Sequence, residues 1–434
     1  MRNTWFTKKA MNIYVLMDLI KGGYILSKAE KKPAYWNIAQ TKSIQKFVKH
    51  IYKIPFYRDR FNAANIGIDE IKSGEDFLKL PILTKEEYKS WILKETANRE
   101  KYKNWLKGHT TGSTGMPLDL YYLPTDRAAE IANLFRCALI QGKDYHVFTD
   151  RIFSTMTSKP KKQKKISIPY NKQMSSLSAP EDLVTGYNNA KPDFYYGNKT
   201  AILMIATHAL DNNIPLWKPK CVGSTSEILD RNARKIIEEA FGKEILFDIY
   251  GCAECGNFAV EKIGADGGHI IWNDTHVVNL VNEREVKNKP GYKIGELAIT
   301  SLIHYGFPMV NYLLGDTVEI KEVNGVKYIT RILGRTNDTI KNRDGSSFSW
   351  LHIYRVMSDI TDIMQFRVIQ KSYEKLLFVL AAKGLNNQRM IEIEKTILER
   401  ILLWGGPTKI NFEWCERINP DSTGKIRMVI SEVD

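Results

Sequence analysis

The N-terminal part of the chain spaces its apolar residues in the way helices do. A mostly apolar run, MNIYVLMDLIKGGYIL, begins at Met11 and is interrupted by Asp18 and Lys21. It is too short to span a bilayer, so we expect an amphipathic helix that packs on the protein, with membrane association as the alternative. Residues 41–61 predict a further amphipathic helix that ends before Pro55.

The middle of the chain alternates short strand patterns with helical patterns. Thr125 is the expected N-cap of one of the helices, and Gly242 directly follows the end of another. The expected strands are 118–122 and 245–249, and 221–227 is expected to be a strand end that runs into a loop. The expected helices are 126–140, 200–209 and 231–241. This alternation predicts an α/β core.

The second half changes character. Short strands at 295–300 and 317–320 are separated by glycine turns, which predicts a β-rich region packed beside the core. After Gly334 the expected order is strand, hairpin, helix and strand, with strands at 366–370, 376–382 and 409–414 and a helix at 390–403. We therefore predict a small α+β domain over 335–434, and a large domain over 1–334.

Composition and charge narrow the functional classes. The 434 residues are 43% hydrophobic and 26% charged, as in soluble globular proteins, and no secretory signal is visible. Lys and Arg outnumber Asp and Glu by 63 to 49, so the net charge of +14 favours anionic partners such as phosphorylated ligands or a membrane surface. The densest basic run, KPKKQKK at 159–165, has no interleaved aromatic residue, and we expect no nucleic-acid binding.

The cysteine pattern indicates a reducing compartment. The five cysteines are an odd number spread over a long chain, which is not the pattern of a disulfide framework: Cys137, Cys221, Cys252, Cys255 and Cys415. We therefore expect a cytoplasmic protein, with association at a membrane as the alternative.

A loop rich in hydroxyl groups and glycine is the first candidate for chemistry. The stretch KGHTTGSTGMP runs from Lys107 to Pro117. Glycines let backbone N–H groups approach a ligand closely, and hydroxyls add donors, so the loop suits phosphate. The spacing of a Walker A loop is absent, because Gly112 is followed five residues later by Pro117. An ordinary flexible turn remains the alternative.

Further candidates lie at turns. Tyr250 and Gly251 end a predicted strand just before Glu254, so a base could stack on the ring and the carboxylate could bind Mg²⁺. Asp316 follows a glycine and suits two ribose hydroxyls, and Lys425 lies on a glycine turn near the C-terminus. Each of these also fits an ordinary turn or a solvated charge.

In this order the motifs resemble those of the adenylate-forming superfamily. Within it, the chain looks most like the phenylacetate–CoA ligase family, especially the CapK-like branch associated with capsular polysaccharide biosynthesis. The resemblance covers nearly the whole chain and also includes segments 55–58, 224–227, 295–297 and 424–433. It implies a large ATP- and carboxylate-binding domain with a β-rich subdomain, and a small mobile C-terminal domain that carries Lys425.

The resemblance also implies roles for single residues. Lys425 would be the adenylation lysine, Glu254 would bind Mg²⁺, and Asp316 with Arg335 would hold the ribose. The other implied ATP- or AMP-binding residues are Thr110, Thr111, Gly112, Ser113, Thr114, Gly115, Ser226, Glu227, Tyr250 and Gly251.

The chain departs from the family pattern at several of these motifs. Met116 stands where relatives commonly have Lys, Ala253 where they have Thr or Ser, Asn311 where they often have Arg, and Asn337 where they have Asp. A lost charged hydrogen bond can be worth about 1.5–3 kcal/mol, so slow adenylation or an inactive relative is the alternative to an active enzyme.

A zinc site is a weaker candidate. Cys252 and Cys255 are spaced as zinc ligands often are, and His269 follows them, but Lys262 stands where relatives often have a cysteine. We therefore expect buried thiols rather than bound zinc.

The functional expectation follows from these residues and the resemblance. The chain is expected to use ATP and Mg²⁺ to adenylate a small-molecule carboxylate and to pass the acyl group to an acceptor. The acceptor would be coenzyme A, or an amine or hydroxyl on a polysaccharide precursor. A non-catalytic nucleotide-binding scaffold of a polysaccharide assembly system is the alternative.

Overall fold

The computed structural model describes two compact units. It covers residues 2–97, 100–103, 105–110, 118–156, 171–264, 268–335, 339–357, 360–403, 407, 409–421 and 424–433. One unit comprises residues 1–144 and 249–331, and the other comprises residues 145–248 and 332–434. The predicted division into domains 1–334 and 335–434 stays a prediction.

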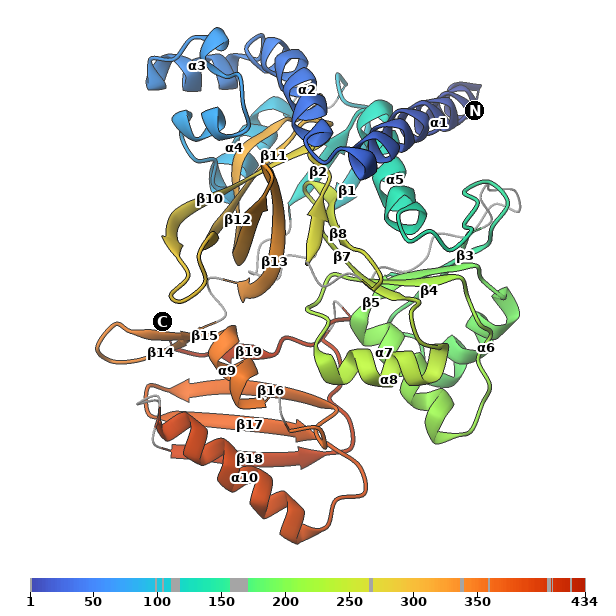
Figure 1. The fold of residues 1–434 in the computed structure, drawn as a ribbon, viewed down its shortest axis with the longest axis vertical. Helices are drawn as coiled ribbons and strands as arrows, with labels where there is room; N and C mark the ends of the chain where they lie inside the picture. Colours follow the sequence, from blue (N-terminus) through green and yellow to red (C-terminus); the bar gives the residue numbers. More distant parts are fainter. Residues whose placement is uncertain are drawn as a thin grey trace. The chain divides into compact units, whose positions relative to one another are not determined.

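The first unit combines helices with a largely antiparallel sheet. Tyr88 of α4 (Lys85–Glu95) joins its helix to the segment before β12 (Met309–Val323), because its hydroxyl donates to the Phe307 carbonyl O at 2.9 Å. The helices are α1 (Arg2–Lys31), α2 (Tyr35–Ile51), α3 (Pro55–Ala64), α4 (Lys85–Glu95) and α5 (Pro124–Leu139), with short 3₁₀ helices at Ile68–Glu70 and Glu75–Lys79. Helices α1 and α5 lie side by side (Figure 1).

The strands of the first unit run in the order β10-β11-β12-β13-β9-β8-β7, and a separate hairpin pairs β1 with β2. Their bounds are β1 (Leu106–His109), β2 (Asp119–Tyr122), β7 (Leu246–Cys252), β8 (Gly256–Glu261), β9 (His269–Ile271), β10 (His276–Glu285), β11 (Tyr292–Ser301), β12 (Met309–Val323) and β13 (Val326–Arg335). The predicted β-rich region is therefore present.

The second unit begins with a parallel sheet covered by helices. Strands β3 (Ile152–Met156), β4 (Asn171–Ser175), β5 (Phe194–Asn198) and β6 (Cys221–Thr225) run in the order β6-β5-β3-β4. Every residue of β6 is buried, as expected for a strand in a covered parallel sheet. The covering helices are α6 (Pro180–Ala190), α7 (Lys199–Asp211) and α8 (Arg231–Phe241).

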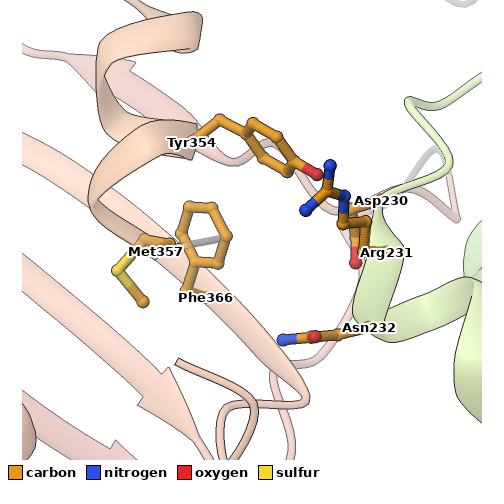
Figure 2. Close-up of a pocket in the computed structure, with 6 residues that line it drawn as sticks. All are labelled: Asp230, Arg231, Asn232, Tyr354, Met357 and Phe366. Atoms are coloured by element: carbon orange, nitrogen blue, oxygen red, sulfur yellow. The ribbon is translucent and has the colours of Figure 1, made fainter. Parts of the chain in front are cut away.

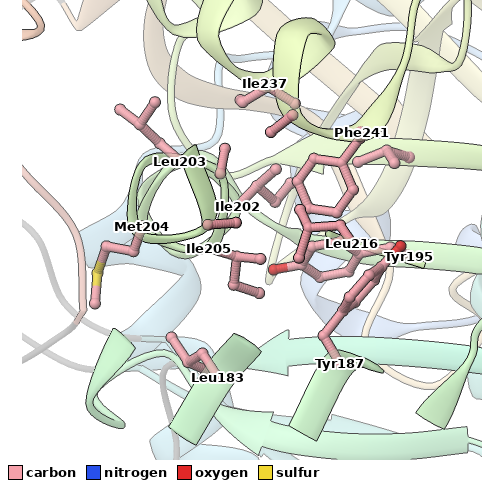
Figure 3. Packing of buried hydrophobic residues seen from close by; sticks show 14 of the residues in the cluster. Leu183, Tyr187, Tyr195, Ile202, Leu203, Met204, Ile205, Leu216, Ile237 and Phe241 are labelled. Carbon is pink, nitrogen blue, oxygen red and sulfur yellow. The ribbon is translucent and has the colours of Figure 1, made fainter. Parts of the chain in front are cut away.

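These helices share one apolar core with the parallel strands. Tyr187 of α6, Tyr195 of β5 and Phe241 of α8 meet side chains of α7 such as Ile202 and Ile205 (Figure 3). The helix α7 is buried along most of its length, which explains why its sequence is apolar on nearly every side. The core fixes the end of β6, which the predicted site residues Ser226 and Glu227 follow.

The C-terminal part of the second unit is the expected α+β arrangement. Its sheet has the order β18-β17-β16-β19, and Ile393, Ile397 and Ile401 of α10 are buried in its core. Helix α10 lies along this sheet (Figure 1). The elements are β14 (Thr339–Lys341), β15 (Ser347–Ser349), α9 (Trp350–Met357), β16 (Gln365–Ser372), β17 (Lys375–Ala381), α10 (Asn387–Leu402), β18 (Lys409–Cys415) and β19 (Val429–Ser431).

Two local predictions are wrong. Helix α5 begins at Pro124 with Leu123 as its N-cap, so Thr125 lies inside the first turn; proline favours the first helical turn because its φ is already helical. The predicted short strand 317–320 is part of β12, which extends from Met309 to Val323. The strand continues past Gly315 because this glycine adopts a φ of +80° without ending the pairing.

Candidate functional site

The hydroxyl-rich loop is closed at its base by Thr110. The Thr110 amide donates to the Leu118 carbonyl O at 3.0 Å, and the Leu118 amide donates to Thr110 Oγ1 at 2.9 Å. The side chain of Thr110 is therefore used to hold the two ends of the loop together. The predicted phosphate-binding residues Thr111, Gly112, Ser113, Thr114 and Gly115 lie outside the described residues, as do Met116 and Asn337.

The hairpin that carries this loop is joined to the turn that carries Glu254. Tyr122, at the end of β2, donates from its hydroxyl to the Ala253 carbonyl O at 2.8 Å. Ala253, Glu254 and Cys255 form the turn between β7 and β8. Two motifs more than a hundred residues apart in sequence thus meet within the first unit.

The backbone of β8 comes so close to Gly251 that a side chain has no space at this position. The pairing sets Gly251 opposite Asn257 and Cys252 opposite Gly256. A Cβ atom at Gly251 would lie 2.6 Å from Asn257 Oδ1 and 2.7 Å from the Gly256 carbonyl O. A larger residue would separate the strands and displace the turn that follows.

Tyr250 and Asp316 are brought together. The Tyr250 hydroxyl donates to Asp316 Oδ2 at 2.6 Å, and Tyr250 is only 8% exposed. One residue ends β7 and the other lies within β12. The residue expected beside adenine and a residue expected to hold ribose therefore form one contact.

Glu254 is a buried carboxylate beside two phenols. It is 8% exposed, and no side chain in the described ranges donates a hydrogen bond to it. Burial and then the Glu254 charge raise the pKa of Tyr312, and burial, Glu130 and Glu254 together raise the pKa of Tyr122. The Tyr122 and Tyr312 hydroxyls consequently stay protonated near neutral pH.

The cysteines of the same turn are thiols in contact. The Cys255 amide lies 3.3 Å from Cys252 Sγ, and a hydrogen bond with the Cys255 side chain, together with burial, raises the pKa of Cys252 well above its ordinary value. Among the described residues, no three His, Cys, Asp or Glu side chains form a group that could hold a metal. His269 lies on β9 with its ring 6.3 Å from that of Tyr250. The expectation of buried thiols rather than bound zinc stays a prediction.

The structure supplies a reason for Asn311, one of the departures from the family pattern. Its side-chain amide donates to the Leu80 and Phe77 carbonyls, the former at 3.0 Å, so it binds the 3₁₀ helix Glu75–Lys79 and the residue that follows it. It is 1% exposed and has a φ of +50°, a conformation that asparagine tolerates better than most residues. Asn311 is thus a structural residue of β12.

A buried hydrogen-bond chain, which sequence reasoning missed, runs beneath the turn of Glu254. Glu130 Oε1 lies 2.9 Å from His304 Nε2, and His304 Nδ1 lies 2.7 Å from Ser301 Oγ. Ser301 Oγ lies 3.4 Å from His276 Nε2, which is 3.0 Å from the Cys255 carbonyl O. We call these four side chains the Glu130–His276 chain.

The sequence of helix α5 contains a pattern of polar residues that could have predicted the Glu130–His276 chain. Asp126, Glu130, Asn133 and Arg136 are spaced by four, three and three residues and are all buried, so they share one helix face. Polar residues on the buried face of a helix require partners inside the protein. The partners themselves lie in strands and loops of ordinary appearance and carried no signal.

In the second unit, Glu227 and Asn198 hold the segment of Lys425. Asn198 Nδ2 donates to the Gly424 carbonyl O at 2.8 Å, and the Ile426 amide donates to Glu227 Oε1 at 3.2 Å. Glu227 also accepts from Thr200 at the start of α7, through its amide at 3.0 Å and its hydroxyl at 2.6 Å. The Glu227 carboxylate is therefore already engaged by protein donors.

The remaining predicted residues lie on the surface or at turns. Ser226 is exposed with a φ of +70°, directly after β6. Lys425 is partly exposed and follows Gly424, whose amide donates to the Asp421 carbonyl O at 2.9 Å. Arg335 is exposed at the end of β13.

A second attachment of the C-terminal part surrounds a small hollow. Asn232, at the start of α8, donates to the Ile363 carbonyl O at 2.9 Å and to the Ile360 carbonyl O at 3.3 Å. Tyr354 points toward Arg231 across the hollow (Figure 2). The lining residues are Asp230, Arg231, Asn232, Tyr354, Met357 and Phe366, and none of them is a predicted site residue.

Comparison with known proteins agrees with the predicted family. Residues 340–432 match the family model of the CapK C-terminal domain. The chain is 25% identical to Protein CapK of Staphylococcus aureus over an alignment 447 residues long, which covers 96% of each chain. The resemblance to CapK is confirmed. The chain is also 24% identical to the phenylacetate-coenzyme A ligase of Escherichia coli (strain K12), over 69% of this chain and 71% of that enzyme.

A solved structure shows the same fold. A 2-hydroxyisobutyryl-CoA ligase in the postadenylation state, in complex with an acyl-AMP, superimposes with a TM-score of 0.71 at 17% identity, over 91% of this chain and 89% of that ligase. The α/β fold predicted from the sequence is therefore confirmed.

Proposed function

We propose that this CapK-like chain is an ATP-dependent ligase that adenylates a carboxylate and transfers the acyl group to an acceptor. The observation that carries the proposal is the hydrogen bond from the Tyr250 hydroxyl to Asp316 Oδ2, at 2.6 Å. Tyr250 lies on β7, the strand that leads into the turn of Glu254. Two separate motifs, one with Tyr250 and Glu254 and the other with Asp316, thereby meet at one place, and Tyr122 joins the hairpin of the hydroxyl-rich loop to the same turn. The likeness to CapK and to acyl-CoA ligases supports this interpretation.

The residues of the first unit suit the nucleotide. The loop closed by Thr110 would hold the phosphates, Tyr250 and Gly251 would lie against adenine, and Asp316 would accept from the ribose hydroxyls. Asp316 accepts from the Tyr250 hydroxyl, and a carboxylate can accept several hydrogen bonds. Tyr250 would thus orient the carboxylate that binds ribose.

Glu254 fits the requirements of a magnesium ligand. Glu254 lies at the turn between β7 and β8 with 8% of its surface exposed, and a carboxylate oxygen is a ligand that magnesium prefers. Magnesium held there would neutralise charge on the phosphates. Ala253 cannot donate a side-chain hydrogen bond to the α-phosphate, so Glu254 would act without the hydroxyl that relatives have beside it.

Lys425 would bring a positive charge to the reacting groups. A carboxylate attacks a polyanion poorly, because the two repel each other, and a lysine point charge between them lowers this repulsion. Arg335 would bind the ribose together with Asp316. The acyl adenylate formed would then react with coenzyme A, or with an amine or hydroxyl of a polysaccharide precursor.

The first test is ATP–pyrophosphate exchange by the purified protein with Mg²⁺ and a pool of carboxylic acids. We expect exchange by the wild type and a loss of about a hundredfold or more in Lys425→Ala and in Glu254→Gln. Lys409→Ala and Glu322→Gln remove exposed side chains of the same types and should leave exchange unchanged.

The same assay separates the alternative function. If the wild type binds ATP but no carboxylate supports exchange, the chain is a nucleotide-binding scaffold. Equal exchange by wild type and Lys425→Ala would contradict the proposed role of this lysine.

A further inference from the structure

The long N-terminal helix α1 has two apolar faces, and only one of them is covered by protein. The covered face contains Val15, Leu19, Ile25 and Ala29, each less than 9% exposed. Gly22 lies on the same face, where a Cβ atom would come within 2.7 Å of Arg136 Cδ of α5. This face accounts for the packing of α1 on α5.

The opposite face is apolar and exposed. Ile13, Met17, Ile20 and Tyr24 are 57%, 60%, 65% and 56% exposed. Their spacing of four, three and four residues places them in one stripe along the helix, on the side away from the covered face. Leu16 at 41% and Tyr14 at 38% widen the stripe. Isolated exposed apolar residues are ordinary, whereas a continuous stripe indicates an interaction surface.

The charges around the stripe have one sign. Lys21, Lys28 and Lys31 are exposed, and the Lys28 ammonium lies 5.5 Å from the centre of the Tyr24 ring. The two acidic residues in this part of the helix are turned away. Asp18 is buried enough for its pKa to be raised, and Glu30 lies 3.6 Å from Lys262. The exposed face therefore presents apolar side chains edged by lysines.

We propose that this face of α1 binds the surface of an anionic lipid bilayer, with the helix lying in the plane of the interface. An apolar stripe edged by lysines is the pattern of interfacial helices, which bury the stripe at the acyl boundary and pair the lysines with lipid phosphates. Among the described residues no helix is long and apolar enough to cross a membrane. The net charge of +14 would add long-range attraction.

The charges argue against a second copy of the chain as the occupant. Two α1 helices packed through this stripe would bring Lys21, Lys28 and Lys31 of one copy toward the same lysines of the other, with no acidic residue on the face to offset them. A lipid surface supplies the opposite charge. The proposal goes beyond the ligase activity and does not depend on it.

The test is sedimentation of the full chain with vesicles of phosphatidylcholine alone or mixed with phosphatidylglycerol. We expect binding to the mixed vesicles, and at least a tenfold loss of affinity in Met17→Gln/Ile20→Gln. The matched control is Ile391→Gln/Leu402→Gln on α10, whose side chains are 58% and 54% exposed, and it should bind as the wild type does. Lys21→Gln and Lys28→Gln should each weaken binding to the mixed vesicles about fivefold.

Other results would overturn the proposal. Wild type that stays in the supernatant with both vesicles, or a Met17→Gln/Ile20→Gln variant that sediments as the wild type does, would show that the face does not bind lipid. Light scattering completes the test by measuring the oligomeric state. A wild type that forms an oligomer and does not bind vesicles, together with a Met17→Gln/Ile20→Gln variant that alone dissociates, would assign the face to contacts between copies. Unfolding midpoints of all variants should match the wild type, since the changed side chains are exposed.

Discussion

At the scale of single residues, the geometry of the candidate site depends on close contacts of individual residues. Gly251 touches the opposite strand, Tyr250 is hydrogen-bonded to Asp316, and Thr110 closes its own loop. Each of these contacts uses an atom that a conservative substitution would remove or displace. The residues that the sequence singles out for chemistry therefore also determine the local geometry.

Replacing Gly251 by alanine should destabilise the protein. The new Cβ would lie 2.6 Å from Asn257 Oδ1 and 2.7 Å from a backbone oxygen, and relieving such overlap costs about 1–3 kcal/mol. Gly23→Ala is the control, because nothing lies within 4 Å of its Cβ position and alanine favours a helix by about 1 kcal/mol. Denaturant unfolding measures both, and a Gly251→Ala variant as stable as Gly23→Ala would contradict the geometry described.

The sequence singled out candidate site residues but did not predict how they meet. Tyr250, Glu254 and Asp316 were identified by their neighbours in the chain, but the contact between Tyr250 and Asp316 was not. It joins positions 66 residues apart and depends on the shifted pairing of β11 with β12 near Gly315. Shifts of this kind follow from packing on both faces of a sheet, and a single sequence does not display them.

At the scale of elements, the Glu130–His276 chain ties helix α5 to the turn of Glu254. Burial would raise the pKa of Glu130, but the hydrogen bond and charge of His304, with Arg127, outweigh burial and lower it. Burial lowers the pKa of His276 to about 3. Glu130 is thus ionised and His276 neutral near neutral pH. The Glu130–His276 chain therefore has a negative charge at Glu130, and its other end, His276, contacts the Cys255 carbonyl O.

His276 should make the protein sensitive to acid. Its pKa falls from 6.5 in an unfolded chain to about 3 in the folded one, so the unfolded chain binds the proton first as the pH falls below 6.5. Stability is therefore lost over this window, by about 2 kcal/mol between pH 7 and pH 5. His276→Gln should remove that loss, although it lowers stability at pH 7 by disturbing the chain.

Unfolding free energies at the two pH values measure the effect. His208→Gln on α7 is the control, because His208 is only half-buried. This substitution should leave the difference in unfolding free energy between pH 7 and pH 5 unchanged. An equal loss between pH 7 and pH 5 in wild type and His276→Gln would show that other groups cause it.

The elements themselves were largely predictable, and the exceptions have physical reasons. The spacing of apolar residues predicted α8 and α10 because each has one buried face on a covered sheet. The start of α5 was misplaced because proline at the first helical position competes with threonine as a signal. The length of β12 was underestimated because a glycine usually ends a strand, whereas Gly315 only bends it.

At the scale of the whole molecule, polar contacts link the parallel sheet and helices of the second unit to the C-terminal part of that unit. Asn198 and Glu227 bind the backbone on either side of Lys425, and Asn232 binds the loop after α9. The sequence predicted Glu227 as a nucleotide-binding residue, and in the structure it binds protein donors. Its role toward ATP stays a prediction.

Removing the Glu227 side chain should release the segment of Lys425. In Glu227→Ala the Ile426 amide loses its acceptor at 3.2 Å, and we expect its hydrogen exchange to become at least tenfold faster, because a hydrogen bond to a charged group contributes about 1.5–3 kcal/mol. Asn188→Ala, which removes a side-chain bond to the Pro215 carbonyl, is the control. Unchanged exchange at Ile426 would show that this contact does not hold the segment.

The central claim is that this molecule makes an acyl adenylate. The most direct measurement is mass spectrometry of the products after incubation with ATP, Mg²⁺ and a pool of aryl, fatty, amino and uronic acids, with and without coenzyme A. We predict an acyl-adenylate mass that is absent with Lys425→Ala, and its conversion to a thioester if coenzyme A is the acceptor. ATP bound without any adenylate from the pool, or an equal yield from Lys425→Ala, would contradict the claim.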